Sequence, residues 1–170
     1  ISYLYPESDL VGRGSHAEFT GVTFAGEGQE LDTGAKMVHL APDTTSLITS
    51  KSLSKAGGSS IYRSAIYIGP EAKGSKASVS CDGLMLDNKS RSDTIPAMEI
   101  HTDECAVGHE AKIGRISGDA IFYLMSRGIS EEEARTMIVS GFANPVSKEL
   151  PLEYAVEMNN LIRLEMKGNM

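Results

Sequence analysis

The stretch Gly108-His109-Glu110-Ala111-Lys112-Ile113-Gly114 marks the place where the sequence changes from one secondary-structure pattern to another. Before it, short runs alternate apolar and polar residues between turn residues, which is typical of β-strands. After it, apolar residues recur at helical spacing. The pattern therefore predicts two parts, a β domain over residues 1–114 and a small helical domain over residues 115–170.

The predicted β domain contains seven short runs bounded by glycine, proline, aspartate or asparagine. These runs are residues 19–24, 36–40, 46–50, 61–68, 77–81, 84–86 and 97–100. They are rich in serine, threonine and alanine, and small side chains that stack on one another favour a β-solenoid. No clean sequence repeat is evident, so a sandwich and a barrel remain open alternatives at this point.

The helical domain is predicted to hold three helices. They run from Ser117 to before Gly128, from Ser130 to Gly141, and from Pro151 to about Lys167. Ser130-Glu131-Glu132-Glu133 forms a capping box, in which the serine and the third glutamate satisfy each other's backbone amides. Gly141 is expected to end the second helix, and Pro145 to lie in a loop. A helical domain of this size is too small to fold alone, and its helices must therefore pack on the β domain, on a partner, or on both.

Composition and charge exclude several classes of function. The 170 residues carry a net charge of −7, so there is no basic excess to neutralise nucleic-acid phosphates. No apolar run approaches the roughly 20 residues that span a bilayer, and no signal peptide opens the chain. Two cysteines are too few for a disulfide scaffold. We therefore expect a cytoplasmic protein that binds neither nucleic acid nor membrane.

The residues with the most distinctive chemistry are Cys81, His109 and Glu110. Asp82-Gly83 follows Cys81 as a turn signal and would put the thiol at a rim, although a buried cysteine is the alternative. His109 and Glu110 are adjacent, so on a strand only one of them would face a given site. No zinc-type spacing, phosphate loop or nucleophile elbow accompanies them. The local pattern leaves a metal site, an acid–base pair and a purely structural role open.

Long motifs across nearly the whole chain add to this interpretation. They include Lys36-Met37-Val38-His39-Leu40-Ala41-Pro42-Asp43, Asp93-Thr94-Ile95-Pro96, Phe122-Tyr123-Leu124-Met125-Ser126-Arg127-Gly128-Ile129-Ser130, and Leu150-Pro151-Leu152-Glu153-Tyr154-Ala155-Val156-Glu157. In these motifs the chain resembles the SufB/SufD family of iron–sulfur cluster assembly proteins. Cys81-Asp82 and Glu110 resemble the SufB branch, because the SufD branch usually lacks Cys-Asp and has glycine in place of Glu110. Gly83 and Gly108 depart from the family's usual serine and acidic residue.

The resemblance implies a right-handed parallel β-helix followed by a small α-helical domain. It implies a scaffold that builds an iron–sulfur cluster and passes it on, without catalytic turnover. Cys81 and Glu110, with His109 beside them, are implied as ligands of a transient cluster. The implied partners are a SufC-type ABC ATPase, which docks on the helical domain 115–170, and a SufD-type subunit or a second copy of the chain.

Two further expectations follow from the resemblance. The family's long N-terminal region has no counterpart here, so we expect the chain to be the C-terminal part of a SufB-type protein. A mixed ligand set suits a scaffold, because carboxylate or imidazole holds a cluster less firmly than thiolate. The separation of Cys81 and His109 along the chain is about that of one solenoid rung.

The alternative to a cluster scaffold is a SufD-like interaction module, which has no cluster ligands and only dimerises and docks the ATPase.

Overall fold

The computed structural model describes residues 1–167 and divides into two compact units, Ile1–Gly114 and the chain from Arg115 onward. The first unit consists of parallel β-strands that coil into a solenoid of about four turns, and the second contains three helices. The predicted parallel β-helix followed by helices is therefore confirmed.

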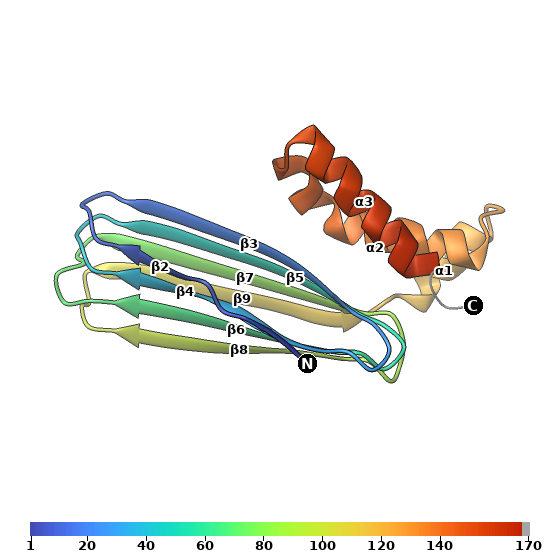
Figure 1. Ribbon diagram of the computed structural model, residues 1–170, viewed down its shortest axis with the longest axis horizontal. Coiled ribbons are helices and arrows are strands. Elements are labelled where there is room, and N and C mark those ends of the chain that lie inside the picture. The colour runs from blue at the N-terminus through green and yellow to red at the C-terminus, as the bar shows by residue number, and fades with distance from the viewer. Residues whose placement is uncertain (168–170) are drawn as a thin grey trace. The chain divides into compact units, whose positions relative to one another are not determined.

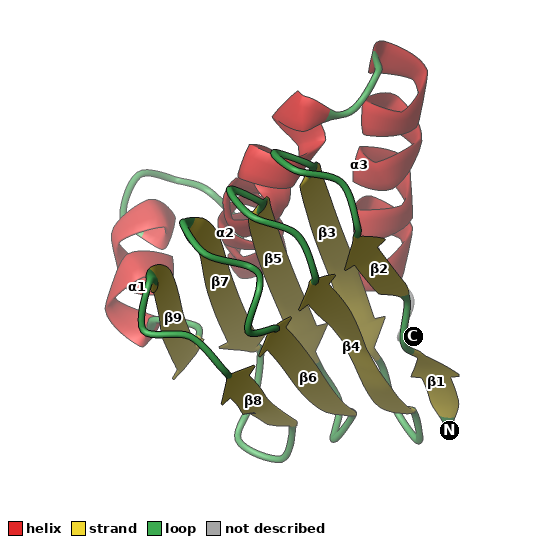
Figure 2. Ribbon diagram, turned by 90° about the vertical axis from the view of Figure 1, so that its left-hand side faces the viewer, coloured by secondary structure: helices red, strands yellow, loops and turns green. Residues whose placement is uncertain are grey.

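The strands of the first unit alternate between two sheets as the chain advances (Figures 1 and 2). The strands are β1 Ser2–Leu4, β2 Glu7–Leu10, β3 His16–Ala25, β4 Glu30–His39, β5 Thr45–Ser54, β6 Ser59–Ile68, β7 Ser75–Met85, β8 Arg91–Ile100 and β9 Cys105–Arg115. One sheet has the order β1-β4-β6-β8, with β2 also paired to β4, and the other has the order β3-β5-β7-β9. We call one strand from each sheet, such as β6 with β7, a rung.

Successive rungs are not equally long. His16 of β3 is the strand partner of Thr45 of β5, and Thr45 is the strand partner of Lys76 of β7. More residues separate Thr45 from Lys76 than separate His16 from Thr45. The step from Ser59 to its strand partner Arg91 is longer still. The added residues shift any repeated motif out of phase. This unequal spacing explains why the sequence shows no clean repeat.

The core lies between the two sheets, where inward-facing side chains stack from rung to rung. Ile48 is fully buried and lies between its strand partners Phe19 and Val79. Much of the interior is small and polar, and serines such as Ser50, Ser60 and Ser64 are buried. The serine-rich runs are therefore core strands, in which small side chains allow close stacking.

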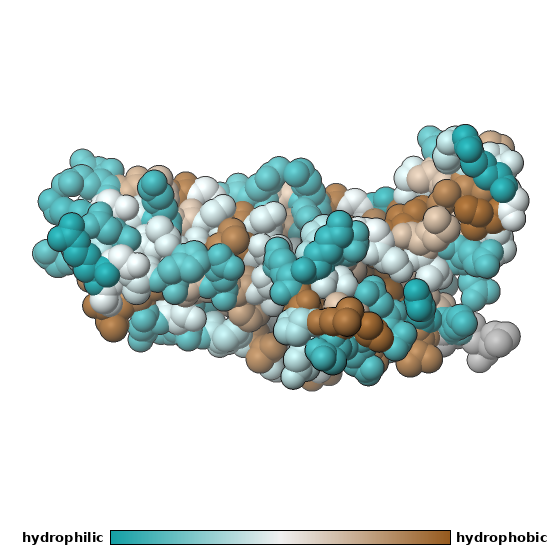
Figure 3. Space-filling model, turned by 90° about the horizontal axis from the view of Figure 1, so that it is seen from above, coloured by the Kyte–Doolittle hydropathy of each residue, from teal (hydrophilic) through white to brown (hydrophobic). Residues whose placement is uncertain are grey.

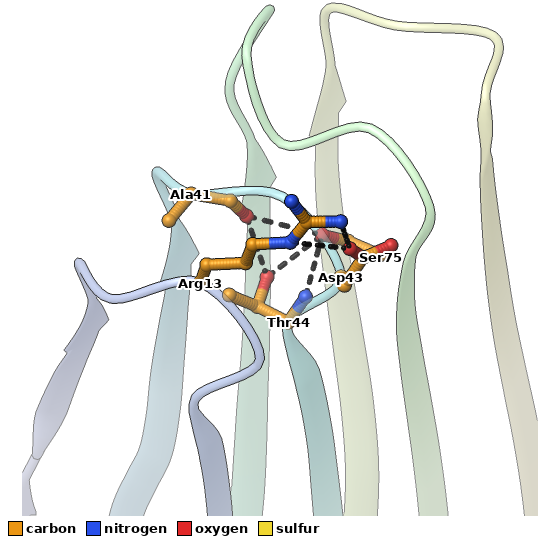
Figure 4. A network of polar contacts seen from close by, with 5 residues as sticks. All are labelled: Arg13, Ala41, Asp43, Thr44 and Ser75. Carbon is orange, nitrogen blue, oxygen red and sulfur yellow. Dashed lines mark hydrogen bonds and ion pairs between the residues drawn. The ribbon is translucent and has the colours of Figure 1, made fainter.

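One corner of the solenoid repeats a left-handed backbone residue in successive rungs. Gly14, Asp43 and Gly74 have φ values of 71°, 58° and 72°. Figure 4 shows how the corner is held: the Arg13 guanidinium pairs with the Asp43 carboxylate at 2.9 Å, and the Thr44 and Ser75 hydroxyls lie 2.7 Å apart. The rungs are thus connected at this corner by side chains as well as by the backbone ladder.

His39 extends this corner network into the interior. Its side chain is fully buried, with Nδ1 2.8 Å from the Thr44 hydroxyl and Nε2 2.8 Å from the Ser46 hydroxyl. Burial lowers the pKa of His39, because a charged imidazolium would lose its hydration. The folded chain therefore holds His39 neutral at neutral pH.

His39 is expected to make stability fall in mild acid. Its folded pKa lies below the unfolded value of about 6.5, so its stabilising contribution is complete above that pH and is lost as the pH falls toward the folded value. The loss is up to about 1.4 kcal/mol per pH unit within that window. Urea unfolding at pH 7 and pH 5 should show a smaller pH dependence in His39→Gln than in the wild type. A pH dependence in His39→Gln as large as that of the wild type would contradict the assignment.

The second unit contains α1 Gly118–Met125, α2 Glu131–Glu149 and α3 Leu152–Lys167. Ser117 caps α1, and the predicted capping box of Ser130 and Glu133 begins α2. The prediction that Gly141 ends the second helix is wrong, because α2 continues through Gly141 and Pro145. The buried residues of α2, which include Ala134, Val139, Ala143 and Val146, lie on both sides of the glycine. Packing therefore outweighs the local helix-breaking tendency.

None of the helices in the described part of the chain is both long and apolar enough to cross a bilayer.

Candidate functional site

Cys81 lies inside the solenoid and not at a rim. Asp82-Gly83 does not form a turn, because β7 continues without interruption to Met85. The side chains of β7 alternate, so that Val79, Cys81 and Gly83 are buried and Asp82 faces outward. Cys81 is only 3% exposed and belongs to the main apolar cluster. Of the two alternatives for this cysteine, the structure therefore shows the buried one and not the thiol at a rim.

A narrow polar pocket surrounds the Cys81 side chain. It is lined by Ser50, Ser52, Tyr62, Cys81, Asp82, Gly83, Ser92, Asp93, Thr94 and Ile113. The pocket is too narrow to hold a water molecule. The five strands from β5 to β9 all contribute to it, so it lies next to the final rung.

Burial keeps the Cys81 thiol and the Tyr62 phenol of this pocket protonated. Burial raises the pKa of the Cys81 thiol, and the neighbouring Thr94 hydroxyl opposes that effect. Burial also raises the pKa of Tyr62 strongly, and the nearby Cys81 adds to that rise. The Tyr62 hydroxyl has no hydrogen-bond partner within residues 1–167. The pocket therefore holds a thiol beside a phenol whose O–H is uncommitted.

His109 and Glu110 lie within β9 and not at the junction that the sequence pattern predicts. Adjacent strand residues face opposite sides, and here His109 is half-buried whereas Glu110 is exposed. The His109 Nε2 atom is buried without a partner in the described part of the chain. Glu110 is paired on the outer surface with Lys112 at 2.7 Å.

The stacking of β9 on β7 shows which residues lie next to each other. A Cβ on Gly83 would lie 3.3 Å from Cγ1 of Ile113, one rung later in the chain. Asp82 acts electrostatically on Lys112, which fits the same register. This register also places His109 beside Val79. Cys81 and His109 are thus both inward-facing but are displaced along the strands, while Glu110 lies on the opposite face of the sheet from Cys81.

Asp82 belongs to an ion pair that the sequence does not reveal. Its carboxylate lies 2.6 Å from Nζ of Lys51 on the neighbouring strand β5, and the two side chains are 24% and 10% exposed. Lys51 and Asp82 are strand partners, so the pair lies directly over the sheet that carries Cys81. Only knowledge of the strand register brings Lys51 to this position.

The three predicted ligands do not converge in this structure. Over residues 1–167, no group of three or more His, Cys, Asp and Glu side chains is arranged to hold a metal ion. Cys105, the second cysteine, is half-buried against the core, and its Sγ lies 3.4 Å from the Thr102 carbonyl oxygen. Its role in the structure is packing.

The helical unit carries a second candidate surface. A groove of about 660 Å³ on α2 and α3 is lined by Ile129, Glu132, Glu133, Thr136, Met137, Ser140, Arg163 and Lys167. Large apolar side chains are exposed on the helices of this unit, and brown patches interrupt the mostly polar surface in Figure 3. The exposed set includes Phe122, Tyr123, Leu152, Tyr154, Val156, Leu161 and Leu164. An exposed apolar face of this kind is typical of a protein-binding surface.

Comparison with known proteins places these features in a family. Residues 1–142 match the family described as SUF system FeS cluster assembly, SufBD core domain. An iron–sulfur cluster assembly SufBD family protein of Staphylococcus aureus (strain USA300) is 54% identical over 169 residues, and one of Staphylococcus haemolyticus (strain JCSC1435) is also 54% identical. Each alignment covers 99% of this chain and 36% of the relative, so the chain spans about a third of their length. The chain belongs to the SufBD family of the SUF system for iron–sulfur cluster assembly.

Proposed function

We propose that this chain is part of a scaffold subunit on which the SUF system assembles an iron–sulfur cluster before passing it to acceptor proteins. The observation that carries the proposal is the 54% identity, over 99% of the chain, to proteins named for iron–sulfur cluster assembly. The scaffold has no catalytic turnover of its own. The cluster is its cargo, which the scaffold holds and then releases.

Cys81, Glu110 and His109 are proposed as the residues that hold the cluster. A thiolate anchors iron well, and a carboxylate or imidazole holds it loosely, which suits a cluster that must leave. Cys81 and Glu110 face opposite sides of one sheet. Both therefore reach one cluster only if β9 moves or if a second chain completes the site. Within residues 1–167, β9 is the last strand of its sheet, so its outer edge has no strand partner there and is available for either event.

The partners are proposed to occupy two different surfaces. The exposed apolar helices and their groove support docking of a SufC-type ATPase on the helical unit. Within the described residues β8 and β9 are the last strands of their sheets, and their unpaired outer edges support pairing with a SufD-type subunit or with a second copy of the chain. The protein is proposed to act in the cytoplasm.

A second candidate function is an interaction module that binds no cluster. Two observations favour it: the Cys81 thiol is buried, and the Glu110 carboxylate is already paired on the outer surface. In this case the β-helix serves as a dimerisation platform and the helices dock the ATPase.

Cluster reconstitution separates the two candidates. The chain is incubated anaerobically with ferrous iron and sulfide, and visible absorption is recorded for the wild type, Cys81→Ala, Glu110→Ala and His109→Ala. We expect Cys81→Ala to lose most of the thiolate-to-iron absorption, because it removes the strongest ligand, and the other two to release iron to a chelator about tenfold faster.

Matched controls are available for both kinds of ligand. Cys105→Ala removes the other thiol, and Glu104→Ala removes a carboxylate that is paired with Lys73 at 2.7 Å, just as Glu110 is paired with Lys112. Both controls should match the wild type. Identical cluster spectra for the wild type and all three ligand variants would show that these residues are not the ligands, and the absence of cluster absorption in every chain, the wild type included, would favour the interaction module.

A further inference from the structure

The buried hydroxyl of Tyr62 costs folding free energy, and packing of the fold alone does not explain why it is there. Its side chain is 3% exposed, and its hydroxyl has no hydrogen-bond partner within the described residues. Burying a hydroxyl without a partner costs about 1–3 kcal/mol, and a phenylalanine of the same shape would avoid that cost. An unsatisfied buried donor is therefore a reason to look for a ligand.

The Tyr62 hydroxyl shares the narrow pocket with Cys81. Tyr62 lies on β6 and Cys81 on β7, so they belong to one rung and approach each other from opposite sheets. Both residues line the pocket.

The neighbouring hydroxyls of the pocket differ in what they can offer the sulfur. The Ser52 and Ser92 oxygens lie 3.1 Å apart and are engaged with each other, and the Ser52 hydroxyl also reaches the Asp82 carbonyl oxygen at 3.4 Å. The Thr94 hydroxyl acts on the Cys81 sulfur and lowers the pKa of the thiol, whereas the Tyr62 hydroxyl has no hydrogen-bond partner in the described part of the chain. The pocket thus places two hydroxyl donors in its lining with Cys81, of which Thr94 already acts on the sulfur and Tyr62 has no partner.

We propose that Tyr62 is a positioning residue for Cys81, whose hydroxyl donates a hydrogen bond to the cysteine sulfur when that sulfur binds iron. A thiol is a weak acceptor, so the phenol gains little from it in the empty chain. An iron-bound thiolate carries negative charge and accepts a stronger, charge-assisted bond. Hydrogen bonds to cluster sulfurs stabilise the bound cluster and set its potential. The inference rests on the proposed function, because it requires Cys81 to hold the cluster.

The test compares Tyr62→Phe with Tyr67→Phe, a variant on the same strand whose side chain packs near His101 and not in the pocket. Each chain is reconstituted with iron and sulfide. The measurements are the melting temperature without cluster, the rate of cluster loss to EDTA, and the position of the thiolate-to-iron absorption band. For Tyr62→Phe we expect an equal or higher melting temperature, about tenfold faster loss, and a shifted band. Tyr67→Phe should match the wild type in all three.

The failure of this inference can be distinguished from the failure of the proposed function. Wild-type cluster loss and an unshifted band in Tyr62→Phe, while Cys81→Ala loses the cluster, overturn this inference alone. A cluster that survives Cys81→Ala overturns both this inference and the proposed role of Cys81 as a ligand. If Tyr62→Phe does not fold, 3-fluorotyrosine at position 62 provides a stronger donor of nearly the same shape. Slower cluster loss in that chain supports the inference, and an unchanged rate contradicts it.

Discussion

Gly34→Ala is expected to destabilise the β-helix by about 3 kcal/mol or more, which is a large part of the stability of a small domain. Gly34 lies in β4, opposite Arg63 of β6. A Cβ at this position would lie 2.9 Å from the Arg63 carbonyl carbon and would overlap its oxygen. The obstructing atoms are backbone, so they cannot turn aside as a side chain would. Urea unfolding followed by circular dichroism measures the loss.

Gly108→Ala is the matched control for this prediction. Gly108 also lies in a strand, β9, but a Cβ there would meet nothing within 4 Å. Its stability should change by no more than about 0.5 kcal/mol. Equal effects at the two positions would show that the loss reflects glycine replacement in general and not the contact with Arg63.

Asp82→Asn is expected to cost about 3 kcal/mol, because it removes the carboxylate from a mostly buried ammonium. Lys51 is 10% exposed at its side chain, and its Nζ lies 2.6 Å from the Asp82 carboxylate. In this position the lysine charge is poorly hydrated, so water replaces the lost partner incompletely. Urea unfolding at neutral pH is again the measurement.

Two controls separate the ion pair from a general effect of charge removal. The double variant Lys51→Met with Asp82→Leu replaces both charges with apolar groups and should recover most of the stability that Asp82→Asn loses. Glu104→Gln breaks the exposed pair with Lys73 and should cost less than about 1 kcal/mol. A double variant as unstable as Asp82→Asn would count against the explanation.

The β-solenoid class of the fold could be predicted because the strands are short, are bounded by turn residues and are rich in small side chains. The seven predicted runs all overlap strands, although residues 77–81 and 84–86 belong to the single strand β7. The register was not predictable, since the unequal lengths of successive rungs hide the repeat. Contacts such as that of Lys51 with Asp82 depend entirely on this register.

The candidate site shows why a local signal misleads. Asp82-Gly83 has the composition of a turn, but Asp82 pairs with Lys51, and a Cβ on Gly83 would collide with the Ser92 hydroxyl inside the solenoid. The glycine therefore serves close packing in a strand. Strand alternation alone predicted that the side chains of His109 and Glu110 point to opposite faces of the sheet, and they do so in the structure. Tyr62 carried no signal, because its position beside Cys81 comes from the stacking of two sheets.

A solenoid of stacked rungs has a consequence for the dynamics of Cys81. Each rung contacts only its neighbours, so the structure opens by fraying from an end and not as a single cooperative unit. Cys81 lies on β7, and only the final rung, β8 with β9, lies beyond it. Local unfolding of that single rung exposes the thiol, while the rungs that carry Ile48 and His39 remain closed. A cysteine that is buried on average is thereby accessible at a small fraction of the cost of global unfolding.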